Sequence, residues 1–202
     1  MNVQEIQYRV KNCQKCHLCH TLPYDDIEEK RCTPVAGRGD FKAKLMLVGK
    51  CPGSDEVAYG MPFVGDSGKL LDKMLEEADI KRENCYTSNV VRCWSRTPDL
   101  KSNRPLKNDE IATCKHFLWW EIQEIEPEVI VTLGKVPTYT LLHTQLNKTF
   151  SILKIIGQEY TVHYCNSSII PVPHPSFLLQ RNKGMIKDVV EIFKNIRGRL
   201  NE

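Results

Sequence analysis

Four of the nine cysteines in this chain are spaced as the ligands of a metal centre could be. Cys13 and Cys16 form a Cys-x2-Cys pair near the N-terminus, whereas Cys93 and Cys114 follow far along the chain. Such a pair can bind one centre from a single turn, and the two distant cysteines complete the site only if the fold brings them close. Four thiolates of this kind hold Zn²⁺ or an iron–sulfur cluster. The site would attach the N-terminal arm to the middle of the chain.

The same region also fits a different chemistry. Residues 13–17 (CQKCH) and 16–20 (CHLCH) each match the attachment pattern of a c-type haem, but they share Cys16, so only one could be used. Haem attachment normally accompanies export, for which the sequence carries no signal. Zinc in the four thiolates stays open, because spacing alone separates zinc poorly from an iron–sulfur cluster.

Composition favours an ordinary globular protein. With 202 residues, 41% of them hydrophobic and 26% charged, the chain suits one α/β domain over residues 1–202 that includes a metal-binding arm of about residues 1–40. No apolar run reaches membrane-spanning length, and the polar N-terminus does not resemble a secretory signal. Nine cysteines without such a signal favour a reducing compartment. We therefore expect a monomer that is intracellular, in the cytoplasm or, outside prokaryotes, in the nucleus or a viral compartment.

Basic residues are concentrated in two segments although the net charge is only +3. Residues 92–107 hold five basic side chains against one acidic, and residues 178–200 hold six against two. Clusters of this kind suit a polyanionic partner, although a solvated surface would account for either segment alone.

Periodicity places the candidate loops at the ends of strands. Short apolar runs predict strands at residues 45–49, 85–91, 128–134 and 169–173, with a hairpin around 152–156 and 160–165. Helical patterns predict helices that begin at a cap at Asp66, near Asn108, after residue 134 and from Gly184. This alternation implies a mostly parallel sheet covered on both faces. Ligands bind at the carboxyl ends of such strands, and the polar loops of this chain follow strands.

Four linked blocks resemble the iron–sulfur uracil-DNA glycosylases, the family 4 type and its close relatives. They are the Cys13/Cys16 pair, KCPGSDEVAYGMPFVGDSGKLL (50–71), YTSNVVRC (86–93) and HPSFLLQ (174–180). The resemblance spans nearly the whole chain in the family's order. It implies a three-layer α/β/α sandwich with a central, mostly parallel four-stranded sheet. It also implies an enzyme of base-excision repair that flips uracil out of DNA and hydrolyses its N-glycosidic bond.

The resemblance makes Cys13, Cys16, Cys93 and Cys114 the ligands of a structural [4Fe–4S] cluster. The segment between the last two is longer than is usual in the family. The remaining cysteines have no counterpart among the ligands and are expected to be small buried apolar residues or spare thiols. They are Cys19, Cys32, Cys51, Cys85 and Cys165.

The family's base pocket can be transferred residue by residue. Phe63 matches the aromatic residue that stacks on the flipped base. Asn89 matches the residue that pairs with the uracil edge, because an amide can donate to O4 and accept from N3–H. His174 matches the histidine that donates to O2 and stabilises the departing anion, and Pro175 would stiffen its loop.

The loop after the first predicted strand would complete the pocket. Glu56 matches the acidic residue that positions or activates water, or that stabilises the oxocarbenium-like sugar, and the neighbouring Asp55 could take its place. Backbone amides from Cys51 to Gly53 would line the pocket, because glycine lets the main chain approach a ligand closely.

The block after His174 is expected to contact DNA. Leu178, Leu179 and Gln180 match a loop that wedges into the space left by the flipped nucleotide. Arg181 and Lys183 would then lie near phosphates. Alternatively, the two leucines begin the apolar face of the last helix.

Lys50 and Cys51 depart from the family pattern, which has Glu and then a small residue at these positions. Lys50 could pair with Glu56 or Asp55 or contact a phosphate, could change the preferred deaminated base, or could attack C1′ to form a Schiff base. Two other kinds of protein remain as alternatives. One is a non-catalytic iron–sulfur protein that binds DNA, and the other is a zinc-stabilised interaction module.

Overall fold

A computed structural model of the chain describes residues 1–19, 33–97 and 103–200. Six strands in these segments form one sheet in the order β1-β3-β2-β4-β6-β5. The four inner strands run parallel, and they are β3 (Cys85–Asn89), β2 (Leu45–Gly49), β4 (Val129–Leu133) and β6 (Cys165–Val172). Two short antiparallel strands flank them, β1 (Arg38–Gly39) beside β3 and β5 (Tyr160–Val162) beside β6. The mostly parallel sheet is confirmed, with six strands where the resemblance implies four.

The central strand β2 explains why helices cover both faces of the sheet. Successive side chains of a strand point to opposite faces, and all of Leu45, Met46, Leu47 and Val48 are buried. Leu45 and Leu47 belong to one apolar cluster, whereas Met46 and Val48 belong to the other. A strand that is apolar on both sides needs a layer of helices on each.

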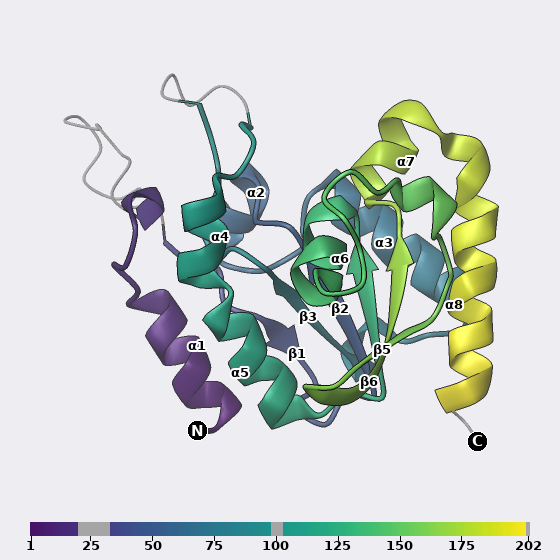
Figure 1. Cartoon of the computed structure of the whole chain (residues 1–202), viewed down its shortest axis with the longest axis horizontal. Helices are drawn as coiled ribbons and strands as arrows, with labels where there is room; N and C mark the ends of the chain where they lie inside the picture. The colour runs from purple at the N-terminus through teal and green to yellow at the C-terminus, as the bar shows by residue number, and fades with distance from the viewer. Residues whose placement is uncertain (20–32, 98–102, 201–202) are drawn as a thin grey trace.

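The helices divide between the two faces as the three-layer prediction requires (Figure 1). One face is covered by α1 (Val3–Lys11), α5 (His116–Ile125) and α6 (Lys135–Leu142). The other is covered by α3 (Asp66–Glu77), α7 (Pro175–Arg181) and α8 (Ile186–Leu200). Shorter helical segments are η1 (His17–Cys19), α2 (Ser54–Tyr59), η2 (Arg82–Asn84), α4 (Asn108–Cys114), η3 (Ile152–Lys154) and η4 (Lys183–Met185). Among the described helices, none is long and apolar enough to cross a bilayer.

The structure corrects several predicted element boundaries. Residues 50–65 are not all loop, because they contain α2, which buries no residue and so has no apolar periodicity to reveal it. Gly65, not Asp66, is the N-cap of α3. The helix expected from Asn108 is two helices that meet at Lys115. Residues 152–156 contain the short segment η3, and the β5–β6 hairpin uses residues 160–162 and 165–172 instead.

A buried ion pair lies beneath the face that α5 covers. The Arg92 and Glu121 side chains are at most 1% exposed, and Arg92 Nη2 lies 2.7 Å from Glu121 Oε2. The Glu121 carboxylate also accepts hydrogen bonds from Tyr86 Oη at 3.1 Å and Ser88 Oγ at 2.5 Å. The network therefore joins α5 to β3 and to the segment that follows β3. Removing one member of such a pair leaves an uncompensated charge in the interior.

We predict that Glu121→Gln lowers the free energy of unfolding by about 3–5 kcal/mol, because the buried Arg92 charge loses its counter-ion. Urea denaturation followed by circular dichroism measures the change. The matched control is Glu128→Gln, which breaks a surface pair with Lys44 at 2.8 Å whose side chains are half exposed. The control should cost at most about 1 kcal/mol. Equal costs for the two variants would contradict the prediction.

Candidate functional site

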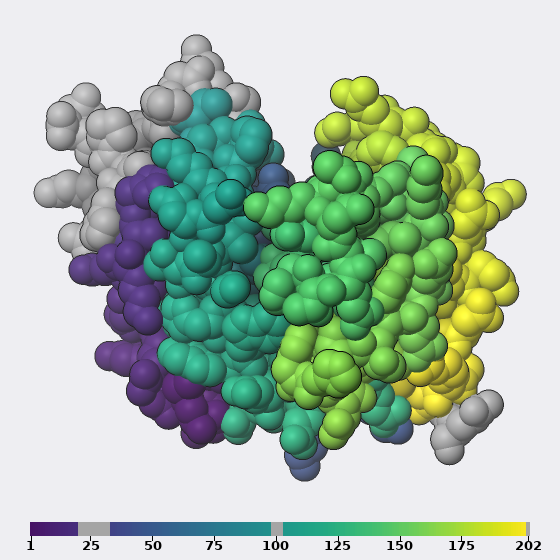
Figure 2. All heavy atoms as spheres, viewed as in Figure 1, coloured from purple at the N-terminus to yellow at the C-terminus, as the bar shows by residue number. Residues whose placement is uncertain are grey.

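A pocket of about 600 Å³ opens at the edge of the sheet where the parallel strands end. All four inner strands contribute to its lining, through Lys50 after β2, Asn89 at the end of β3, Leu133 at the end of β4 and His174 after β6. Figure 2 shows the hollow between the teal residues and the green and yellow residues at the top of the view. The position agrees with the expectation that ligands bind at the carboxyl ends of parallel strands.

Gly49 forms the floor on which two of the predicted residues meet. It pairs with Asn89 in the β2–β3 register. A Cβ atom added at Gly49 would lie 2.4 Å from Asn89 Oδ1 and 2.5 Å from Phe63 Cζ. Both side chains therefore rest against the bare main chain of this glycine. Sequence reasoning gave Gly49 no role in the site, although a glycine that ends a buried strand is a signal for close approach.

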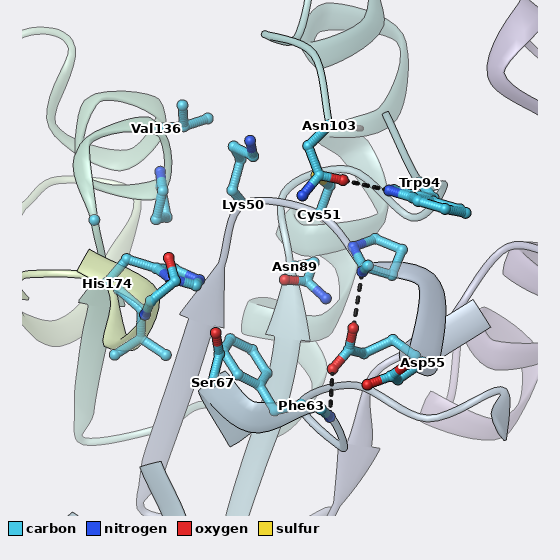
Figure 3. A pocket seen from close by; sticks show the side chains of 18 of the residues that line it. Lys50, Cys51, Asp55, Phe63, Ser67, Asn89, Trp94, Asn103, Val136 and His174 are labelled. Carbon is cyan, nitrogen blue, oxygen red and sulfur yellow. Dashed lines mark hydrogen bonds between the residues drawn. The ribbon is translucent and has the colours of Figure 1, made fainter. Parts of the chain in front are cut away.

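Phe63 is held in an unusual backbone conformation at the side of the pocket. Its φ angle is 56°, in the left-handed region that non-glycine residues rarely adopt. The Phe63 ring lies 6.1 Å from the imidazole of His174, centroid to centroid, with an angle of 30° between the planes. The two rings thus flank one space, as Figure 3 shows. Outliers of this kind cluster at functional sites, where the surrounding structure maintains them.

The side-chain amide of Asn89 points into the pocket with unused hydrogen-bonding groups (Figure 3). The residue is only 3% exposed, and within the described part of the chain its amide makes no hydrogen bond to protein. Buried polar groups in native proteins are nearly always hydrogen-bonded to protein, water or ligand. An amide left open at the floor of a pocket can bind a planar polar ligand through one donor and one acceptor.

His174 presents a neutral imidazole with a defined tautomer. Burial, and to a lesser extent the Lys50 charge, lower the pKa of His174 to about 4. The backbone N–H of Ser176 donates to His174 Nδ1 at 3.1 Å, so the ring proton sits on Nε2. As the N-cap of α7, the residue is fixed by the start of that helix. His174 therefore carries a hydrogen-bond donor and no net charge near pH 7.

The Glu56 carboxylate, predicted to act on water or on the sugar, lines the pocket and accepts three backbone hydrogen bonds. Its Oε1 accepts from the backbone N–H groups of Val64 and Gly65 at 3.0 and 2.9 Å, and its Oε2 accepts from Gly53 at 2.9 Å. The carboxylate therefore braces the loop that carries Phe63. Asp55, the predicted substitute, is exposed and lines the same pocket. Among the described residues, it accepts one long side-chain hydrogen bond, from Ser54 Oγ at 3.4 Å.

Trp94 and Asn103 form a pocket wall that sequence reasoning missed. Both line the pocket, and Trp94 Nε1 donates to Asn103 Oδ1 (Figure 3). They belong to the segment between Cys93 and Cys114 that is longer than is usual in the family, of which residues 98–102 lie outside the described residues. Nothing in a single sequence indicates that a tryptophan beside a cysteine turns toward the pocket.

The predicted DNA wedge is only partly compatible with the structure. Leu178 is 0% exposed in the core beneath α7, which does not suit a wedge residue. The burial agrees with the alternative of an apolar helix face, although the helix is α7 and not the last one. Leu179 is half-buried against the same core. Gln180, Arg181 and Lys183 are exposed at the end of α7, so they stay free to meet a partner.

The four predicted metal ligands belong to one apolar cluster. Cys93 and Cys114 are buried in it, and Cys13 and Cys16 pack against it from the arm. The Sγ atom of Cys114 accepts the backbone N–H of Arg92 at 3.3 Å. Burial, together with nearby Cys13 and Cys16, raises the pKa of the Cys114 thiol to about 11. Such a thiol needs a strongly positive partner to ionise, and iron or zinc supplies one.

The described residues hold no ready-made site for a single metal ion. Among residues 1–19, 33–97 and 103–200, no three His, Cys, Asp or Glu side chains converge closely enough to hold one metal ion. Cys19 lies beside the ligands but donates its Sγ–H to the Cys16 carbonyl at 2.8 Å. Cys32 and His20 lie outside the described residues.

A buried carboxylate ties the arm to the pocket wall. Glu110 Oε1 lies 2.7 Å from His17 Nε2, and both carboxylate oxygens accept hydrogen bonds from Arg104. Burial alone would raise the pKa of Glu110, but Arg104, the Lys107 N–H and His17 outweigh it and hold the pKa below its usual value. One acid therefore fixes both the turn after Cys16 and the segment that follows Asn103.

Comparison with known proteins identifies the family to which the chain belongs. Residues 36–197 match the family described as the Uracil DNA glycosylase superfamily. The chain therefore belongs to the uracil-DNA glycosylase superfamily. A solved structure of SMUG2 from Pedobacter heparinus has a similar fold, with a TM-score of 0.54 over 79% of this chain and 76% of that one at 14% identity.

Within the superfamily, the similarity is to type-4 members. The chain is 36% identical to the type-4 uracil-DNA glycosylase of Sulfurisphaera tokodaii over 97% of this chain and 84% of that protein. It is 34% identical to the type-4 enzyme of Thermotoga maritima over 92% of this chain and 87% of that protein. The family resemblance read from the four sequence blocks is thereby confirmed.

We predict that burial of neutral His174 makes the protein less stable in acid. The unfolded chain binds a proton near pH 6.5, whereas the folded chain does so only near pH 4. Stability therefore falls as the pH drops through this window, by up to about 3 kcal/mol from this residue. Urea denaturation at several pH values measures the free energy of unfolding of the wild type and of His174→Gln. The free energy should depend less on pH in the variant. The same pH dependence of the free energy of unfolding in both proteins between pH 6.5 and 4 would contradict the prediction.

Proposed function

We propose that this protein is a DNA glycosylase that hydrolyses the N-glycosidic bond between uracil and deoxyribose and leaves an abasic site. The observation that carries the proposal is the open amide of Asn89, buried beside the Phe63 ring and the Nε2–H of His174 in one pocket. A flat ligand with a donor and an adjacent acceptor on its edge satisfies all three groups. Membership of the uracil-DNA glycosylase superfamily supports the same conclusion.

In this proposal each pocket residue acts on a different part of the base. Phe63 stacks on the ring, while Asn89 donates to O4 and accepts from N3–H, a pattern that the cytosine edge reverses. His174 donates its Nε2–H to O2, where negative charge develops as the bond to the sugar breaks. Because the pocket is concave and lies at the end of the sheet, the base must leave the DNA stack to enter it.

The two carboxylates beside the pocket have separate tasks. Water adds to C1′ as the bond from C1′ to N1 breaks, the bonding electrons go to the base, and a proton from the water passes to solvent or to the base. Asp55, exposed at the pocket, can orient that water and offset positive charge on the sugar. Glu56 holds the loop in position through its three backbone hydrogen bonds.

We propose that Cys13, Cys16, Cys93 and Cys114 hold a structural [4Fe–4S] cluster that takes no part in the chemistry. Their shared apolar cluster supports this assignment, and so does the backbone N–H donated to Cys114 Sγ, a contact typical of cluster ligands. The exposed Gln180, Arg181 and Lys183 would contact the DNA backbone, and half-buried Leu179 is the remaining apolar candidate at the flipped site.

An oligonucleotide with a single uracil tests the proposed activity. Wild-type protein should release uracil and leave an alkali-labile site, whereas matched thymine and cytosine strands stay intact. Gly49→Ala should lower the single-turnover rate about 100-fold, because the added methyl group displaces Asn89 and Phe63.

Two further variants make this test specific. Gly198→Ala in α8, where nothing lies within 4 Å of the new methyl group, should keep full activity. Asn89→Ala should lose excision while its thermal melting stays close to that of wild type. Absence of uracil release by the wild-type protein, or full activity of Asn89→Ala, would refute the proposal.

The cluster assignment predicts that anaerobically purified protein contains iron and sulfide in equal amounts and absorbs broadly in the visible range. Cys16→Ser should lose most of the iron, because a thiolate ligand is removed. Cys19→Ser should keep it, although Cys19 lies only three residues away and packs against the same apolar cluster. Zinc in place of iron, or equal iron loss in the two variants, would overturn the assignment.

A further inference from the structure

Lys50 places an ammonium group at the mouth of the pocket. The residue directly follows the central strand β2, and its carbonyl accepts the backbone N–H of Val91 at 3.0 Å, which fixes its main chain. Its half-buried side chain lines the pocket and extends between Asn103 and Val136, beyond the level of Asn89 (Figure 3). Lys50 and Asn89 thus line the same pocket at different levels.

Within the described part of the chain, no acidic group pairs with Lys50, so its charge is available to a ligand there. Among the described residues, the Lys50 ammonium forms no ion pair and no hydrogen bond. The sequence interpretation offered Glu56 or Asp55 as partners, but Glu56 accepts three backbone hydrogen bonds instead. The other lysine in the lining, Lys135, has its ammonium 5.4 Å from the ring centroid of Phe150 and so serves a different contact.

The departing base gains negative charge, which a nearby positive charge would stabilise and which neutral His174 meets only with a hydrogen bond. The imidazole is neutral near pH 7, so it contributes a hydrogen bond but no net charge to the departing base. Lys50 acts on the same space, since its charge contributes to the lowered pKa of His174 and opposes the burial that raises the pKa of Cys51. The site thus separates the two tasks between a neutral donor and a cation.

The orientation of the base brings its reacting end toward Lys50. The sugar stays outside the pocket, so N1 and the adjacent O2 lie nearest the mouth when the opposite edge, with O4, reaches Asn89. Negative charge collects on N1 and O2 as the bond to C1′ breaks. A cation held at the mouth therefore stabilises the transition state more than the bound substrate.

We propose that Lys50 is a catalytic residue that supplies the positive charge for the departing uracil anion. This inference rests on the proposed uracil excision and adds a residue to its machinery. The family pattern has a carboxylate at this position, so the inference concerns the chemistry of this chain in particular. In this proposal Lys50 forms no covalent bond to the substrate.

Single-turnover excision of uracil and of 5-fluorouracil from the same oligonucleotide tests the proposal. The fluorine withdraws electrons, so the fluorinated anion leaves with less help from the protein. Lys50→Met should lower the uracil rate about 100-fold, as loss of one group that stabilises an anion typically does. The loss with 5-fluorouracil should be clearly smaller, and Lys50→Arg should recover most of the uracil rate, because it restores the charge.

Controls separate this role from structural effects and from failure of the proposed function. Lys42→Met removes an exposed lysine from the turn before the same strand, at the opposite edge of the sheet, and should leave both rates unchanged. Thermal melting and affinity for an abasic-site duplex should be equal in wild type and Lys50→Met. If wild-type protein releases no uracil, the proposed function fails and Lys50 is not the cause.

Three results would overturn the role of Lys50 while uracil excision itself stands. Equal losses with the two bases, together with weaker and less salt-dependent DNA binding, would make Lys50 a phosphate contact. An unchanged or faster rate in Lys50→Met would mean that its charge acts chiefly on the positively charged sugar or not at all. A protein–DNA adduct trapped by borohydride in wild type but not in Lys50→Met would make Lys50 a nucleophile.

Discussion

Three backbone N–H groups that converge on the Glu56 carboxylate hold the pocket of this protein in shape. They come from both ends of the loop between β2 and α3, at Gly53, Val64 and Gly65, so one side chain closes that loop on itself. The closure keeps Phe63 in a backbone conformation that a free loop would abandon. A charged acceptor suits this task, because hydrogen bonds to a carboxylate are stronger than those to a neutral group.

The sheet fixes the pocket residues that the Glu56 loop does not hold. Its four parallel strands end together, so residues that are far apart in the sequence become neighbours without any special contact between them. Gly49 and Asn89 are paired in the strand register itself, and His174 follows the strand beside β4. The groups that approach a ligand are therefore fixed by backbone hydrogen bonds, whereas the loops only have to cover them. The pocket floor at Gly49 and Asn89 is therefore set by the sheet, whatever path the loop with Trp94 and Asn103 takes.

The fold and much of the site could be predicted from the sequence, for identifiable reasons. Apolar runs without alternation revealed the strands that are buried on both faces. Local sequence blocks placed Asn89 and His174 at strand ends and Phe63 in the loop after the first predicted strand. The hydrogen bonds of Glu56 could not be predicted, because they depend on which atoms face each other after packing. The burial of Leu178 was one of two alternatives that the sequence left open. Helix α2 escaped detection because it buries no residue and carries no apolar face.

Glu110 links two parts of the molecule whose sequences look unrelated. The same carboxylate receives His17 from the cysteine arm and Arg104 from the segment that follows the pocket wall. A change in either segment alters the anchor of the other, so effects of substitutions in the two segments should be strongly epistatic. When relatives are compared, sequence changes in the cysteine arm should therefore accompany changes in the segment around Asn103 and Arg104. Transplanting one of them alone into a homologue would leave a buried acid without half of its partners.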